Sequence, residues 1–182
     1  MVVRQMVVDA VLLEGRNVRE VARYYESRDS PTGVTKEAAM SRVSTYLNFS
    51  GQSEEALTYY RDLFATRFIG PILRFRDMPL PGAPELSLED AGKIMHMEVE
   101  IAAGHVLMAT DVLASMGQHL RIGNNTTIVV ECDDPAEVDR LYAGLAAGVE
   151  ETAPSVQPWG QYWSTCLDRF GIRWMITTAM GA

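Results

Sequence analysis

Three side chains that could transfer protons or hold a cation stand at alternate positions: His96, Glu98 and Glu100. Successive side chains of a strand point to opposite faces, so residues two apart share a face. A histidine beside a carboxylate there could act as an acid–base pair or as a replacement cation site. A solvated strand face, or one covered by a neighbouring subunit, explains the same spacing without chemistry. The three residues are therefore candidates, and no catalytic residue is assigned.

The loop that follows decides which face of the sheet these candidates occupy. If Ala102-Ala103-Gly104 forms a three-residue hairpin loop with Gly104 in the left-handed conformation, Glu98 lies opposite Met108 and His96 lies opposite Thr110. Both side chains then face the cavity. A two-residue turn would put them outside, and the glycine at the third position favours the longer loop.

Aromatic side chains are concentrated near the C-terminus. They suit either a pocket for a planar or apolar ligand or ordinary core packing. The residues concerned are Trp159, Tyr162, Trp163, Phe170 and Trp174.

The elements that must carry these residues occur twice in the same order, as a strand, a helix and three further strands. β-branched and aromatic runs predict the strands, and an acidic first turn predicts each helix, with Ser53 as the N-cap of one and Pro135 near the start of the other. Strands are expected at 42–49, 72–75, 94–101, 105–110, 126–132, 150–153, 160–168 and 172–178. Asp168, before Arg169-Phe170-Gly171, is interpreted as a turn former.

The N-terminal part of the chain has a different residue pattern. Residues 1–26 show helical spacing of apolar side chains broken at Gly15, residues 27–36 form a linker rich in Ser, Asp, Pro and Gly, and residues 37–40 add a turn of helix. We therefore divide the chain into a helical extension with its linker at 1–41 and a globular domain at 42–182.

Composition restricts the class of protein. A net charge of -8 argues against binding to a phosphate backbone. No apolar run reaches the roughly 18 residues that cross a bilayer, so we expect a cytoplasmic protein with no membrane partner. The two cysteines, Cys132 and Cys166, lack metal-site spacing and are expected to be reduced thiols of the core.

Several stretches, in this order, resemble the PhnB-like branch of the vicinal-oxygen-chelate superfamily, which includes glyoxalases, bleomycin-resistance proteins and extradiol dioxygenases. They are Tyr46-Leu47-Asn48-Phe49, Glu54-Glu55-Ala56, Asp77-Met78-Pro79, Ile94-Met95-His96, Gly123-Asn124-Asn125, Trp159-Gly160 and Asp168–Trp174. The likeness covers about three quarters of the chain and implies an α+β fold of two βαβββ modules that form a pair of half-barrels.

In metal-dependent relatives each module supplies one ligand from its first strand and one from its last. The resemblance carries these positions onto Ser44 and Met108 in the first module and onto Thr127 and Met175 in the second. Hydroxyls and thioethers are poor ligands for hard or borderline divalent ions. We therefore expect no metal and no other cofactor, and a slip of one residue in register offers no better ligands.

The segment Val7–Tyr25 resembles the first two helices of a transposase-like helix-turn-helix domain, but a recognition helix does not follow. Nucleic-acid binding is not expected. An extension that packs on the domain or on a partner subunit is preferred.

Three functions are open at this point. The first is metal-free binding of a small apolar or aromatic molecule, with a homodimer as the expected assembly. The second is a lyase, isomerase or dioxygenase of the glyoxalase type with a relocated active site, so whether the chain is an enzyme is undecided. The third is a ligand-sensing regulator that uses the N-terminal helices. The predicted ligand pocket consists of Ser44, Met108, Thr110, Thr127, Trp159, Tyr162 and Met175.

Overall fold

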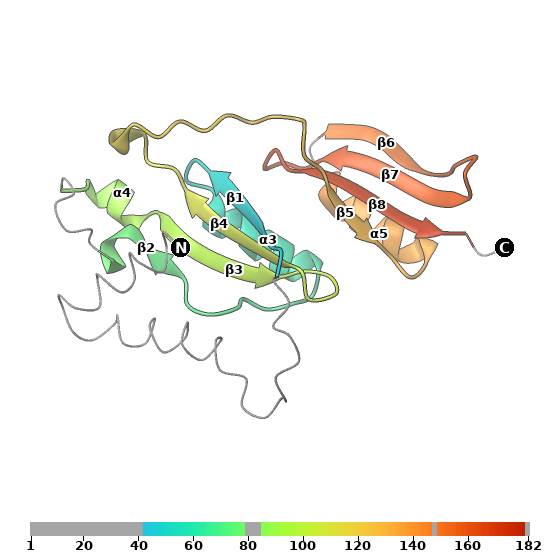
Figure 1. Cartoon of the computed structure of the whole chain (residues 1–182), viewed down its shortest axis with the longest axis horizontal. Coiled ribbons are helices and arrows are strands. Elements are labelled where there is room, and N and C mark those ends of the chain that lie inside the picture. The colour runs from blue at the N-terminus through green and yellow to red at the C-terminus, as the bar shows by residue number, and fades with distance from the viewer. Residues whose placement is uncertain (1–41, 79–84, 147–148, 181–182) are drawn as a thin grey trace, which may run out of the picture. The chain divides into compact units, whose positions relative to one another are not determined.

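The computed structural model describes residues 42–78, 85–146 and 149–180, with the side chains of 149–151 left aside (Figure 1). The chain divides into two compact units. Among the described residues, the first unit holds those up to Leu57 together with those between Arg67 and His119, and the second holds Thr58–Thr66 and those from Leu120 onward. The helices predicted within residues 1–40 lie outside the described part.

The first unit contains a four-stranded sheet in the order β1-β4-β3-β2. Strand β1 pairs with β4 in parallel, and the other two pairings are antiparallel. Its elements are β1 Thr45–Phe49, the first turns of α3 Ser53–Leu63, β2 Leu73–Arg74, a 3-10 turn Phe75–Asp77, α4 Leu88–Gly92, β3 Ile94–Glu100, β4 Val106–Asp111 and a 3-10 turn Ala114–Met116.

The second unit repeats this connectivity. Its sheet runs β5-β8-β7-β6, again with the first strand parallel to the last and with antiparallel neighbours elsewhere. Its elements are β5 Ile128–Glu131, α5 Pro135–Leu145, β6 Val149–Val156, β7 Gln161–Leu167 and β8 Arg173–Ala179. The predicted α+β class and the internal repeat of strand, helix and three strands are confirmed.

The two faces of the first sheet differ in composition. One face packs under α3 (Figure 1) and is buried and almost wholly apolar. It carries Leu47, Phe49, Met97, Val99, Leu107 and Ala109. We call the opposite side the far face of the first sheet; it carries Tyr46 and Asn48 from β1, Met108 and Thr110 from β4, and His96, Glu98 and Glu100 from β3. Burying each large apolar side chain contributes about 1.5–3 kcal/mol, so the α3 side holds this unit together.

The second sheet has the same two-sided pattern. Helix α5 packs on the face that carries Val130, Ser164, Cys166, Trp174 and Ile176, all of which are buried. The far face of the second sheet, on the opposite side, carries Val129, Trp163, Thr165, Met175 and Thr177.

Asp168 does more than form a turn. One carboxylate oxygen accepts hydrogen bonds from the backbone N–H groups of Phe170 and Ile172, both at 2.9 Å. The other accepts from the Tyr60 hydroxyl at 2.6 Å and from the Trp174 indole at 2.8 Å. Asp168 is only 3% exposed, so these four bonds compensate a buried charge.

Some local predictions need correction. Ser53 is the first helical residue of α3, and its hydroxyl donates to Asp111 at 2.8 Å instead of capping the helix. Helix α4 was not predicted. Ser87 caps it by accepting from the Asp90 N–H, a Ser-x-x-acid signal that is visible in the sequence. Predicted strand ends differ from the observed ones by at most three residues. None of the described helices is long and apolar enough to span a membrane.

Candidate functional site

The hairpin between β3 and β4 sets the orientation of the candidate residues. Gly104 has φ +76° and Ala103 has φ +50°, and the Ile101 N–H donates to the His105 carbonyl at 2.9 Å across the loop. Glu98 consequently pairs with Met108. The predicted three-residue loop and its register are confirmed, and His96 and Glu98 lie on the far face of the first sheet.

Three side chains on this face form a connected group, which we call the polar triad: Tyr46, His96 and Glu98. His96 Nε2 lies 2.9 Å from Glu98 Oε1, and His96 Nδ1 lies 3.3 Å from the Tyr46 hydroxyl. The Tyr46 and His96 rings approach with centroids 5.8 Å apart. Exposure increases along the triad, since Glu98 is 3% exposed and Tyr46 is 45% exposed.

The hydrogen bonds within the triad depend on which nitrogen of the His96 ring carries the hydrogen. With Glu98 as a carboxylate, which can only accept, Nε2 carries the hydrogen and Nδ1 presents its lone pair to Tyr46. Burial raises the pKa of the Tyr46 phenol, a hydrogen bond with Thr110 lowers it, and the negative charge of Glu98 raises it. The net effect is a raised pKa, which keeps Tyr46 a neutral phenol that can donate or accept.

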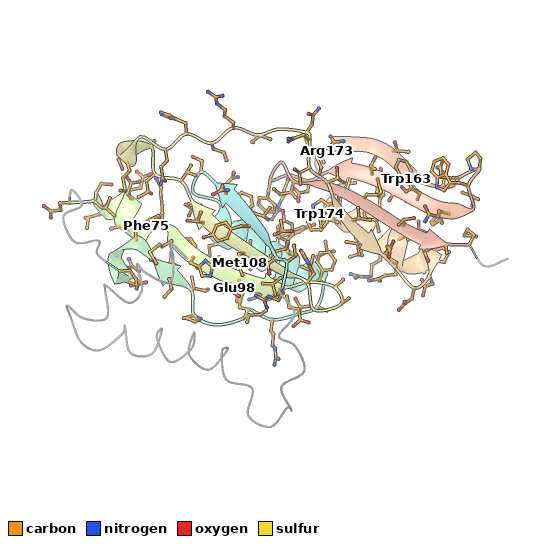
Figure 2. The ribbon with its side chains drawn as sticks, viewed as in Figure 1. Phe75, Glu98, Met108, Trp163, Arg173 and Trp174 are labelled. Atoms are coloured by element: carbon orange, nitrogen blue, oxygen red, sulfur yellow. The ribbon has the colours of Figure 1, made fainter. Side chains whose placement is uncertain are left out.

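Met108 stands at the centre of this arrangement. The pairing register places it directly beside Tyr46 on one neighbouring strand and directly beside Glu98 on the other. Figure 2 shows Met108 and Glu98 next to each other. Thr110 follows on β4, where its hydroxyl donates to the Ile94 carbonyl at 3.3 Å. A polarizable thioether is thus flanked by an aromatic ring and a hydrogen-bonding pair.

Glu100 shares this face at the end of β3, opposite Val106. Tyr46 was not among the residues predicted for the site. The signal was present, because Tyr46 lies two residues after Ser44 and so belongs to the same strand face.

The far face of the second sheet is largely apolar. Met175 pairs with Val129 and with Thr165 on its two neighbours. Trp163 follows on the same face, and Trp159 packs edge-on against it at 6.2 Å between ring centroids. The indole of Trp159 is largely exposed.

Other predicted aromatic residues lie elsewhere. Tyr162 points to the α5 side, where its hydroxyl donates to Asp139 at 2.8 Å. Trp174 and Phe170 are buried in the core beside Tyr60. The predicted pocket residue Tyr162 is therefore not brought together with Met175.

The side chains at the four inherited metal positions do not have the chemistry that a metal ion requires. Met108 lies on the far face of the first sheet and Met175 on the far face of the second. Ser44 and Thr127 directly precede β1 and β5, at positions whose alternation matches Tyr46 and Val129. Thioethers and neutral hydroxyls do not fit a zinc, nickel or manganese ion. Within the described parts of the chain, no three His, Cys, Asp or Glu side chains lie together in a way that could hold a metal ion.

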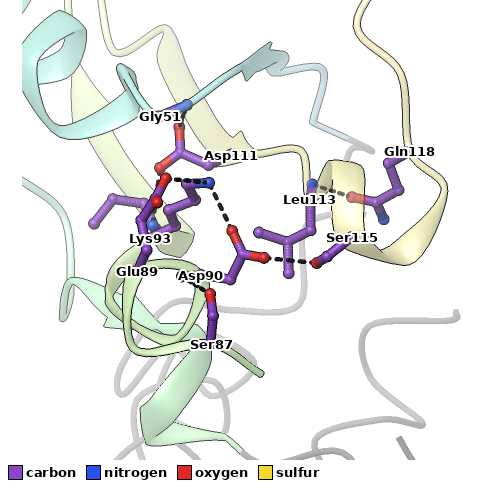
Figure 3. Close-up of polar contacts among 10 residues, drawn as sticks. Gly51, Ser87, Glu89, Asp90, Lys93, Asp111, Leu113, Ser115 and Gln118 are labelled. Atoms are coloured by element: carbon purple, nitrogen blue, oxygen red, sulfur yellow. Dashed lines mark hydrogen bonds and ion pairs between the residues drawn. The ribbon is translucent and has the colours of Figure 1, made fainter. Parts of the chain in front are cut away.

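Two further polar clusters in the first unit are structural (Figure 3). Asp111 accepts from the backbone N–H groups of Gly51 and Ser53 at 3.0 and 3.1 Å and from that of Ile94 at 2.9 Å. Asp90 accepts from Lys93 and from Ser115, both at 2.6 Å. The Lys93 ammonium and the Ser115 hydroxyl hold the pKa of Asp90 below its ordinary value. These carboxylates tie α3, α4 and the ends of β3 and β4 together.

Residues 41–177 match the family model described as 3-demethylubiquinone-9 3-methyltransferase. No functionally curated protein matches the chain significantly.

Solved structures share the fold. Protein PA1353 from Pseudomonas aeruginosa has a TM-score of 0.62 and 24% identity, and the match covers 78% of this chain and 100% of that one. The PhnB protein from Bacillus cereus, described as a putative 3-demethylubiquinone-9 3-methyltransferase, has a TM-score of 0.61 and 23% identity over 76% of this chain and 100% of that one.

The resemblance inferred from the sequence is therefore confirmed, because the family model spans most of the chain and both sheets have the expected βαβββ connectivity. This chain belongs to the 3-demethylubiquinone-9 3-methyltransferase family, the PhnB-like branch of the glyoxalase-fold, vicinal-oxygen-chelate proteins.

Proposed function

We propose that this protein binds a small apolar or aromatic molecule without the metal centre of its superfamily. The observation that carries the proposal is the far face of the first sheet, where Met108 is flanked by Tyr46 and Glu98 and where His96 contacts both of these. Thioether and ring surfaces favour an apolar ligand through area burial and contacts of sulfur with aromatic rings. The polar triad supplies the few hydrogen-bonding groups that orient such a ligand.

The donor chemistry supports the metal-free part of the proposal. Each sheet offers one thioether and one neutral hydroxyl at the inherited positions, and neither supplies the imidazole or carboxylate that these ions require. Without such an ion, the glyoxalase reaction has no Lewis acid to polarise a substrate oxygen.

The far face of the second sheet supports binding of an apolar partner molecule in its own right. Met175 and Trp163 lie there, with Trp159 against Trp163. Of the predicted pocket residues, Ser44, Met108 and Thr110 belong to the proposal for the first sheet, and Thr127, Trp159 and Met175 belong to the separate proposal for the second. We leave Tyr162 out because its hydroxyl donates to Asp139.

Small-molecule mass spectrometry of the purified protein, followed by NMR of its methionine methyl groups, tests this function. We expect an aromatic or apolar compound to co-purify or to be selected from a fragment set, and to shift the Met108 methyl signal saturably. Met108→Ala should weaken binding about tenfold or more, whereas Met116→Ala, at an exposed turn outside the sheet, should not. Absence of any saturable ligand effect at Met108 would refute the proposal for this face.

Metal loading gives a second test. Protein exposed to zinc, nickel or manganese and then dialysed should retain no stoichiometric ion. One firmly held ion per chain, with Met108 or Met175 within bonding distance, would overturn the metal-free assignment.

A second candidate function is catalysis at the polar triad, favoured by the 2.9 Å contact between His96 and Glu98. The candidate residues are His96, Glu98 and Glu100, and the candidate reactions are those of a lyase, isomerase or dioxygenase. The family name adds methyl transfer to a demethylubiquinone. Isomerisation of the methylglyoxal–glutathione hemithioacetal, oxygen uptake with catechols and methyl transfer from S-adenosylmethionine should each be measured for wild type and His96→Asn. Turnover that His96→Asn abolishes would make catalysis the better assignment.

The cellular setting belongs to the same proposal. We expect a cytoplasmic homodimer, to be checked by fractionation and by light scattering of the purified chain. Salt-dependent DNA binding would instead support a function as a ligand-sensing regulator, which depends on the N-terminal residues.

A further inference from the structure

Two tryptophan rings form a corner at the tip of the hairpin between β6 and β7. The ring centroids of Trp159 and Trp163 lie 6.2 Å apart, and the ring planes make an angle of 76°. A flat molecule that lies on one of these rings therefore meets the other ring with its edge. Trp159 is 62% exposed, so a molecule from solution can reach this corner.

The side chain of Gln161 fixes the position of Trp159 and offers hydrogen-bond donors beside it. Gln161 Oε1 accepts a hydrogen bond from the Trp159 indole Nε1–H at 3.1 Å. Because an indole N–H can only donate, the amide oxygen must face Trp159 and the amide NH2 group must face away from it. Gln161 and Trp163 are two residues apart on β7 and share the far face of the second sheet. Within the described residues, the Gln161 NH2 group has no hydrogen-bond partner, so it can donate to a ligand on this face.

Further donors lie at the Trp163 ring itself. The Trp163 indole N–H has no hydrogen-bond partner among the described residues, and its nitrogen is not buried. Ser155 is the neighbour of Trp163 on β6, and its hydroxyl oxygen accepts from the Gln157 amide at 2.9 Å. The hydroxyl hydrogen of Ser155 is thereby left to donate. The polar groups around the corner thus favour a molecule that accepts hydrogen bonds.

The charge of this face decides which kind of acceptor it favours. Glu131, an exposed residue at the end of β5, pairs with Thr177, and Thr177 is the neighbour of Trp163 on β8. A carboxylate on the same face repels an anionic ligand, and the chain as a whole has a net charge of -8. A carbonyl oxygen or an aromatic ring nitrogen can accept hydrogen bonds without adding negative charge.

We infer that the corner formed by Trp159 and Trp163, together with the Gln161 amide, recognises a neutral planar aromatic molecule that carries a hydrogen-bond acceptor. The two rings contribute stacking and buried apolar area. The Gln161 NH2 group and the Trp163 N–H select for the acceptor. The inference rests on the binding function proposed for the far face of the second sheet and adds the chemical class of the ligand.

NMR of the full chain, isotopically labelled at its indole nitrogens, tests the inference with two matched probes. Coumarin can only accept hydrogen bonds and indole can only donate one, yet both are flat molecules of two fused rings. We expect coumarin to bind about tenfold tighter than indole and to shift the Trp163 N–H signal saturably. The chain has three tryptophans, and the third, Trp174, donates to Asp168 in the core, so its signal should not move.

Gln161→Glu is the decisive variant. It keeps the side-chain length and an acceptor for the Trp159 indole, but it replaces the NH2 group by a second acceptor oxygen. Coumarin should then bind about tenfold more weakly, and indole should bind more tightly than it does to wild type. Gln157→Glu is the matched control, because it adds the same charge to the same hairpin at an amide that bonds to Ser155. It should keep the preference for coumarin.

Two further measurements separate the contributions of ring and charge. Trp163→Phe keeps a stacking ring and removes the N–H, so both probes should still bind, with a smaller preference for coumarin. Coumarin-3-carboxylate, which has the same rings and a negative charge, should bind more weakly than coumarin. The Trp174 signal reports in each variant that the core is intact.

The outcomes distinguish this inference from the binding function. Equal binding of coumarin and indole, a preference that survives Gln161→Glu, or tighter binding of coumarin-3-carboxylate would refute the inference and leave the binding function standing. No saturable shift of the Trp159 and Trp163 signals with either probe would refute the binding function at this face and the inference with it. Signals that move on dilution of the protein but not with a probe would refute both and assign the corner to contact with a second copy.

Discussion

Asp168→Asn is the substitution whose effect follows most directly from the structure. The carboxylate serves four donors: the backbone N–H groups of Phe170 and Ile172, the Tyr60 hydroxyl and the Trp174 indole. Asparagine keeps the shape and one acceptor oxygen, which the two backbone groups will occupy. Its amide nitrogen, a donor, then faces Tyr60 and Trp174.

The magnitude depends on what each partner can do in response. The Tyr60 hydroxyl can rotate and accept, whereas an indole N–H can only donate and is left without an acceptor in the core. An unsatisfied buried donor costs about 1–3 kcal/mol, and a hydrogen bond to a charged group contributes about 1.5–3 kcal/mol. We expect Asp168→Asn to lower the free energy of unfolding by about 3–5 kcal/mol, and Tyr60→Phe, which loses one bond, by about 1.5–3 kcal/mol.

Urea unfolding followed by tryptophan fluorescence measures both values. Asp139→Asn is the matched control, because Asp139 also accepts from a tyrosine hydroxyl but at an exposed position. Its effect should stay within about 0.5 kcal/mol of wild type. An effect of Asp168→Asn as mild as that of Asp139→Asn would refute the stabilising role of the buried carboxylate.

The hydrogen bond between Tyr60 and Asp168 also predicts that the protein loses stability at alkaline pH. Burial, followed by the negative charge of Asp168, raises the pKa of Tyr60 well above 10.0, its value in an unfolded chain. The folded state therefore retains this proton after the unfolded state has released it, and stability falls as pH rises above about 10. Wild type should lose more stability than Tyr60→Phe between about pH 9 and 11, and equal losses would contradict the assignment.

Three further predictions concern other parts of the chain. Ser53→Ala removes the 2.8 Å bond to Asp111 and should cost about 1.5–3 kcal/mol of unfolding free energy in urea titrations. Gly171 has φ +83°, so Gly171→Ala should cost about 1–2 kcal/mol in the same assay, whereas Gly92→Ala, whose added methyl would meet open space, should not destabilise. Burial, followed by the charges of Glu137 and Asp134, raises the pKa of Cys132 to about 11, so iodoacetamide should label native Cys132 far more slowly at about pH 8 than the unfolded chain.

Much of the fold follows from local patterns in the sequence. Alternating runs such as Ile94–Glu100 predicted strands because one face is apolar and the other polar. The glycine at position 104 predicted the hairpin loop and hence the face occupied by His96 and Glu98. These predictions held because they depend on neighbours within a few residues.

The partners that complete the sites could not be found in this way. Tyr60 and Asp168 are 108 residues apart, and no local pattern connects a helix residue to a distant turn carboxylate. Tyr46 joins His96 only after β1 pairs with β4 and β4 pairs with β3. Tyr162 was assigned to a pocket from its residue type, but strand alternation turns it toward α5. Tertiary pairing, which is encoded over the whole chain, decides these contacts.

The carboxylate of Asp111 has a consequence for the kinds of molecule that α3 can accept. A helix N-terminus with free N–H groups is a common binding site for phosphate, because the helix dipole favours negative charge there. In this chain the carboxylate of Asp111 accepts hydrogen bonds from Gly51 and Ser53 and so occupies the position of a bound anion. A nucleotide or sugar phosphate would have to displace a covalently attached competitor that costs no entropy of association. The start of α3 is thus closed to phosphorylated metabolites by intramolecular competition.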